Sequence, residues 1–143
     1  MARVVASTGG HSVTDDPARL DMDVVHAEIS GAYRATGRSR ALVERSFANS
    51  FVFGVLAQDG ATVGFGRLVT DRTFRAHIAD VMVMPAARGR GLGHALIAAM
   101  LDHPELATVA TWTLTTADAH GLYARFGFRP SDDDPNWMVL RRA

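Results

Sequence analysis

A glycine-rich turn between two apolar segments is the part of this sequence best suited to chemistry. It reads Arg88-Gly-Arg-Gly91-Leu-Gly93-His94. The apolar residues that follow predict a helix over residues 92–101, and the start of a helix presents free backbone N–H groups that favour an anion. Glycines allow a diphosphate to approach the backbone because no Cβ stands in the way, and Arg88 and Arg90 add charged donors. The turn therefore predicts a phosphate-binding site.

The spacing of the turn separates three known phosphate-binding patterns. A P-loop requires a lysine, and this chain contains none. A dinucleotide fingerprint requires a glycine where this chain has His94. The pattern that fits is Arg/Gln-x-x-Gly-x-Gly/Ala, present here as Arg88-Gly-Arg-Gly91-Leu-Gly93.

The elements that must position this turn follow from the periodicity of apolar residues. A period of 3.6 predicts helices over residues 21–33, 39–49, 92–101 and 117–126. A period of two, with a hairpin signal at Asp59-Gly60, predicts strands over residues 11–15, 51–57, 61–69, 74–84, 109–115, 128–129 and 137–140. We therefore expect an α/β (α+β) fold with a mixed, mostly antiparallel sheet flanked by about four helices. Residues 1–10 are expected to be a flexible leader.

Composition excludes several classes of protein. The chain has 143 residues, which favours one domain, and a formal charge of zero, which argues against non-specific binding to nucleic acid or to an anionic membrane. The absence of cysteine excludes a disulfide framework, thiolate zinc sites and a cysteine nucleophile. The spacing of the six histidines predicts no metal site. Apolar runs are too short to span a bilayer, so a cytoplasmic protein is expected.

Two segments in order along the chain resemble the GNAT family of acetyl-CoA-dependent N-acetyltransferases. The first is Val81-Met-Val-Met-Pro followed by the Arg-x-x-Gly-x-Gly turn and an apolar helix. The second runs from Thr115 to Tyr123-Ala-Arg-Phe-Gly127-Phe128, whose end is similar to a signature of the family. The resemblance covers residues from about His11 to the C-terminus and implies an N-acetyltransferase domain over residues 11–143.

The resemblance implies where acetyl-CoA would bind. The sheet is expected to splay between the strands at 74–84 and 109–115, with acetyl-CoA between them. The backbone of Val81, Met82 and Val83 would pair with the pantetheine arm like an added strand. The diphosphate would be held by the turn and the helix start, which comprise Arg88, Gly89, Arg90, Gly91, Leu92, Gly93 and His94.

The resemblance also implies a direct transfer to an amine, which agrees with the lack of a cysteine nucleophile. Tyr123 matches the family's general acid, which protonates the departing thiolate. A thiol pKa near 8.5 against about 10 for tyrosine makes that transfer uphill by only about 2 kcal/mol. The general base stays open between Asp80, His77, His120 and water alone. Strand alternation places His77 on the face opposite Asp80.

The acceptor is expected to be a small-molecule amine or a peptide. Tyr33 and Asp118 are its candidate contacts, although Asp118 also suits a helix cap. Arginines around residues 34–40 favour an acidic acceptor, whereas the aspartates at 132–134 favour a cationic one, and the sequence does not separate the two. The alternative function is a non-catalytic module that binds or senses acyl-CoA. The family resemblance is also compatible with a homodimer.

Overall fold

The computed structural model describes residues 4–32 and 38–142 of the chain. Tyr33, an expected acceptor contact, lies outside these residues. The helices are α1 (Met22–Ala32), α2 (Arg40–Ala48), α3 (Leu92–Leu101) and α4 (His120–Ala124). The strands are β1 (Val4–Thr8), β2 (His11–Thr14), β3 (Phe51–Leu56), β4 (Thr62–Thr70), β5 (Arg75–Val83), β6 (Thr111–Thr115), β7 (Arg129–Pro130) and β8 (Trp137–Arg141).

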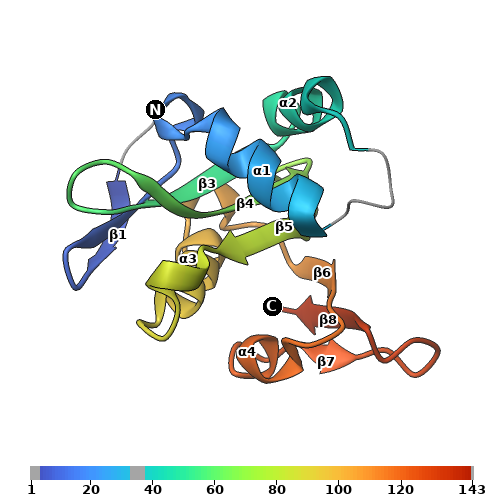
Figure 1. Cartoon of the computed structure of the whole chain (residues 1–143). Helices are drawn as coiled ribbons and strands as arrows, with labels where there is room; N and C mark the ends of the chain where they lie inside the picture. The colour runs from blue at the N-terminus through green and yellow to red at the C-terminus, as the bar shows by residue number, and fades with distance from the viewer. Residues whose placement is uncertain (1–3, 33–37, 143) are drawn as a thin grey trace.

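Among the described residues the strands form one eight-stranded sheet in the order β1-β2-β3-β4-β5-β6-β8-β7. Figure 1 shows β1 at one end of the molecule and β7, β8 and α4 gathered at the other. Neighbouring strands are antiparallel except β5 and β6, which are parallel and are joined through α3. This confirms the expected mixed, mostly antiparallel fold with four helices.

The parallel pair separates part of the way along β5. Its register runs from Arg75 opposite Thr111 to Ile78 opposite Leu114. Beyond Ile78, β5 continues to Val83 while β6 ends at Thr115. The expected splay between these two strands is therefore confirmed, and it leaves one edge of residues 79–83 unpaired within the described part of the sheet.

Helices cover both faces of the first half of the sheet. Val25 and Ile29 of α1, with Val43 and Phe47 of α2, bury one face against Val52 and Phe65. The opposite face packs on α3 through a larger cluster that includes Phe51, Phe53, Leu68, Leu96 and Ile97. Neighbouring residues of β3 thus serve opposite cores, as strand alternation requires. In the described part of the chain, no helix is long and apolar enough to cross a membrane.

The N-terminal segment departs from the expectation of a leader over residues 1–10. Residues 4–8 form β1, which pairs with β2 from Thr8 opposite His11 onward. Gly9 and Gly10 both have positive φ values of 54° and 84°, the conformation that a two-residue hairpin requires. The strand at 11–14 is consequently internal to the sheet rather than at its edge.

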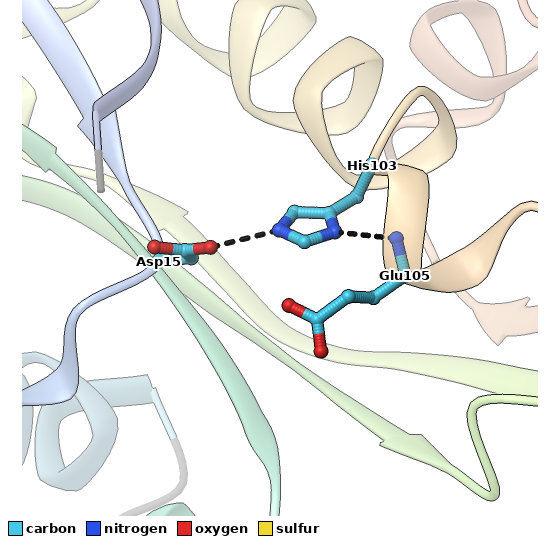
Figure 2. Close-up of side chains that lie close together, drawn as sticks. All are labelled: Asp15, His103 and Glu105. Carbon is cyan, nitrogen blue, oxygen red and sulfur yellow. Dashed lines mark hydrogen bonds and ion pairs between the residues drawn. The ribbon is translucent and has the colours of Figure 1, made fainter. Parts of the chain in front are cut away.

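A buried hydrogen bond between His103 and Asp15 connects this N-terminal hairpin to the end of α3. His103 Nε2 lies 2.8 Å from an Asp15 carboxylate oxygen, and both side chains are buried. The other ring nitrogen, Nδ1, accepts the backbone N–H of Glu105 at 3.1 Å. Figure 2 shows the ring between these two partners. The ring also packs edge-on against Phe51, with 4.9 Å between centroids.

These contacts explain a cluster that has the composition of a metal site. Ligand-type atoms of Asp15, His103 and Glu105 all lie within 4.8 Å of one another. A metal ion needs a lone pair on an imidazole nitrogen. In His103, the Nδ1 lone pair accepts a backbone N–H, and Nε2 donates its proton to Asp15. The cluster is therefore a hydrogen-bonded structural unit.

We expect His103→Phe to destabilise the fold. Phenylalanine preserves a ring against Phe51 but removes both hydrogen bonds and leaves the Asp15 carboxylate buried without this partner. Such a change costs about 2–3 kcal/mol of unfolding free energy. Urea denaturation of the variant beside the wild type measures the loss. A loss below about 0.5 kcal/mol, as is usual for surface substitutions, would contradict the structural role of the pair.

Candidate active site

The site begins with a bulge in β5. Phe65 is opposite Met82 and Arg67 is opposite Ala79, so β5 uses one residue more than β4 over this interval. Asp80 lies within the bulge with a φ of 55°, a left-handed conformation that aspartate tolerates better than most residues. His77, Ala79 and Asp80 therefore line the same cavity. The expected alternation of His77 and Asp80 between two faces is wrong, because the bulge interrupts it.

Two arginines hold the Asp80 carboxylate. Arg38 Nη1 donates to one oxygen at 3.0 Å, and Arg67 Nε donates to the other at 2.7 Å. The Asp80 side chain is only 3% exposed. Arg67 is further fixed by a 3.0 Å hydrogen bond from its Nη1 to Ser50 Oγ. These bonds supply the partners that a buried carboxylate requires and connect β5 to β4 and to the segment before α2.

A cavity of about 420 Å³ opens where β5 and β6 separate. Its walls are residues 78–81 of β5 on one side and, on the other, residues 115–119, which comprise the last residue of β6 and the loop that follows. Ionisable side chains from five parts of the chain line it, namely Arg38, Arg67, His77, Asp80, Asp118 and Tyr123. The structure thus brings together five of the residues singled out in the sequence: His77, Asp80, Val81, Asp118 and Tyr123.

Tyr123 enters this cavity from α4. The side chain is buried, and its ring meets Phe128 edge-on with 5.8 Å between centroids. The residue therefore packs in the core and lines the cavity. The helix that carries it is shorter than expected, because residues 116–119 form a turn in which Thr116 Oγ1 accepts the Ala119 N–H at 3.0 Å.

His77 is held in the cavity wall by two neighbouring strands. Its Nδ1 lies 2.7 Å from Thr113 Oγ1, and its ring stacks on Trp137 with 5.3 Å between centroids. Burial lowers the pKa of His77 below its ordinary value of 6.5, and the positive charge of Arg67 lowers it further. The ring is consequently neutral at neutral pH. In the tautomer in which Nδ1–H donates to Thr113 Oγ1, Nε2 keeps a lone pair that can accept a proton.

The glycine-rich turn lies at the far end of β5. Gly89 and Gly91 have φ values of 81° and 74°, and a Cβ added at either would meet nothing within 4 Å. Gly91 is the N-cap of α3, whose first N–H groups have no partner within the helix. The turn is thus an open, amide-lined surface suited to a diphosphate. Arg88 already donates from Nε to the Val83 carbonyl at 3.0 Å.

Two other expected residues lie outside the cavity. The His120 ring nitrogen Nε2 lies 2.9 Å from the carbonyl oxygen of Pro135, and His120 does not line the cavity. His94 is exposed and packs on Phe126 with 4.5 Å between ring centroids. Sequence reasoning missed Arg67. The available signal was a lone charge within the apolar strand predicted over residues 61–69.

Comparison with known proteins shows which protein family the chain is similar to. A family model described as an acetyltransferase (GNAT) domain matches residues 48–130. A crystal structure from Xanthomonas campestris pv. campestris, described as belonging to the GNAT family, is 38% identical with a TM-score of 0.81, covering 88% of this chain and 89% of that one.

More distant relatives agree with this result. The uncharacterised N-acetyltransferase ycf52 of Gracilaria tenuistipitata var. liui is 25% identical over 119 residues, 82% of this chain. The chain spans only 65% of the length of that relative. An N-acetylglutamate synthase from Neisseria gonorrhoeae, in complex with coenzyme A and N-acetyl-glutamate, is 19% identical with a TM-score of 0.72, covering 96% of this chain and 36% of that one. At that identity the likeness concerns the fold.

The depressed pKa of His77 predicts a pH-dependent contribution to stability. The unfolded state binds a proton near pH 6.5, whereas the folded state binds it only at lower pH. His77 therefore costs no stability above pH 6.5, and its contribution falls as the pH drops from 6.5 toward the folded pKa. His77→Gln, which does not titrate, should lose less stability than the wild type between about pH 7.5 and 5.

Urea denaturation across that pH range measures this difference. Equal losses in the two proteins would contradict a folded pKa below that of the unfolded chain.

Proposed function

The chain belongs to the GNAT acetyltransferase family, and on that premise we propose that it transfers an acetyl group from acetyl-CoA to an amine. One observation carries the proposal: an open, amide-lined turn at the start of α3 adjoins a strand whose edge is unpaired beyond Ile78. The first feature suits a diphosphate, and the second suits an extended amide chain. Coenzyme A contains both.

In this proposal the cofactor lies along β5 and the turn. The amides of residues 89–94 bind the diphosphate, with Arg88 and Arg90 nearby as cations. The unpaired edge at residues 81–83 bonds the pantetheine arm as a neighbouring strand would. The Neisseria synthase, described in complex with coenzyme A, has the same fold. When bound, acetyl-CoA supplies the acetyl thioester and a thiolate leaving group.

The side chains of the cavity divide the proton transfers between them. His77 Nε2 takes a proton from the attacking amine, and a backbone N–H of the β5 bulge stabilises the developing oxyanion. Tyr123 gives its hydroxyl proton to the sulfur as the carbon–sulfur bond breaks. Asp80 is less suited to act as the base, because both of its oxygens accept arginine N–H groups. Asp118 and Tyr33 remain proposed acceptor contacts.

We expect Gly91→Asp to weaken acetyl-CoA binding far more than Gly91→Asn. Asn and Asp have the same shape, and both tolerate the left-handed backbone at this position. Only Asp places a negative charge beside the diphosphate, so its dissociation constant should exceed that of Asn by about tenfold or more, ~1.4 kcal/mol. Calorimetric titration of both variants measures this ratio. Equal affinities of the two variants would contradict binding of the diphosphate at this turn.

We expect Tyr123→Phe to lower kcat by about a hundredfold, as loss of a general acid does. The dissociation constant for acetyl-CoA should stay the same, because phenylalanine preserves the packing on Phe128. Thiol release measures turnover, and calorimetry measures binding. Unchanged turnover would exclude Tyr123 as the acid. Binding without turnover in the wild type would instead favour the alternative, a non-catalytic module that binds acyl-CoA.

A further inference from the structure

We propose that the acceptor is an amine that also carries a carboxylate, and that Arg67 pairs with this carboxylate. The inference rests on the proposed function, since it names the class of acceptor for the same cavity. It is carried by the charges of the cavity wall, by the donors that Arg67 has in excess of its protein partners, and by the place of Asp118.

The wall formed by β4, β5 and the segment before α2 contains more positive than negative charge. Two guanidinium groups, from Arg38 and Arg67, share the single carboxylate of Asp80. His77, the other ionisable side chain on that wall, is neutral at neutral pH because burial and Arg67 lower its pKa. The two guanidinium groups of this wall therefore favour an anionic group on the acceptor.

Arg67 has donors that the fold does not use. A guanidinium carries five N–H groups. In Arg67, Nε donates to Asp80 and Nη1 donates to Ser50 Oγ, which leaves Nη2 available. The side chain is 15% exposed and lines the cavity. Because Asp80 and Ser50 fix its orientation in advance, binding an anion there costs little side-chain entropy. A planar guanidinium edge favours a carboxylate.

The opposite wall carries charge of the other sign. Asp118 lies in the loop after β6, is exposed, and faces the cavity across the gap between β5 and β6. An ammonium group arriving from solvent is attracted to this carboxylate, while a carboxylate on the same molecule is attracted to Arg67. The cavity thus presents complementary charges to both ends of an amino acid.

The test compares acceptors that differ only in the carboxylate. The full chain is supplied with acetyl-CoA and with α-, β- and γ-amino acids, each beside its own carboxamide. Product formation is measured by mass and by thiol release. We expect at least one acid to be acetylated with a kcat/KM roughly tenfold or more above that of its amide, the size of a well-formed charged contact.

Variants of Arg67 test whether this residue contacts the carboxylate of the acceptor. Arg67→Gln should bring the ratio of acid to amide toward one, whereas Arg45→Gln, which removes an exposed cation from α2 outside the cavity, should preserve it. Arg67→Lys keeps a charge beside Asp80 but loses the planar edge, so an intermediate ratio is expected. If Arg67→Gln does not fold, Arg67→Lys and the ratio in the wild type still decide the question.

The possible failures are distinguishable. Amides acetylated as well as their acids, or acetyl-CoA bound with no carboxylate-bearing amine acetylated, would overturn the acceptor class and leave the acetyl-CoA site standing. An acid preference that survives Arg67→Gln would overturn the role of Arg67. Failure of acetyl-CoA to bind in calorimetry would overturn the proposed function itself.

Discussion

The buried carboxylate of Asp80 is the constraint on which the site depends. It lies in a bulge with left-handed backbone, where two arginines from distant segments take one oxygen each. The bulge brings Asp80 into the cavity beside His77, and the pairing of β5 with β6 ends just before it, at Ile78. One charged cluster therefore stabilises the distorted strand and places two guanidinium groups in one wall of the cavity.

The glycine-rich turn before α3 is the second feature on which the proposed site depends. Two of its three glycines, Gly89 and Gly91, adopt left-handed φ values that allow the chain to turn between β5 and α3. The same open backbone is what an anion needs at a helix start. The turn and the cavity lie at opposite ends of the unpaired edge of β5, so a long substrate with a diphosphate at one end and a reactive group at the other can span them.

Local signals in the sequence predicted much of this arrangement. The 92–101 helix, the Asp59-Gly60 hairpin and the splay between the strands predicted over residues 74–84 and 109–115 are confirmed. What sequence reasoning missed depends on contacts between distant residues. Asp80 meets an arginine 42 residues earlier, and Asp15 meets a histidine 88 residues later. No periodicity encodes such pairs. The prediction from strand alternation was also wrong for His77 and Asp80, because the bulge in β5 interrupts the alternation. The segment that forms the Gly9-Gly10 hairpin was predicted to be a flexible leader.

The central claim is that the turn before α3 binds the diphosphate of coenzyme A. Titration of coenzyme A into ¹⁵N-labelled protein, followed through backbone amide chemical shifts, tests it most directly. The account predicts large, saturating shifts for the amides of Gly89, Gly91 and Gly93, together with shifts along residues 81–83. Saturating shifts elsewhere while these three amides stay unchanged, or no shifts at all, would contradict it.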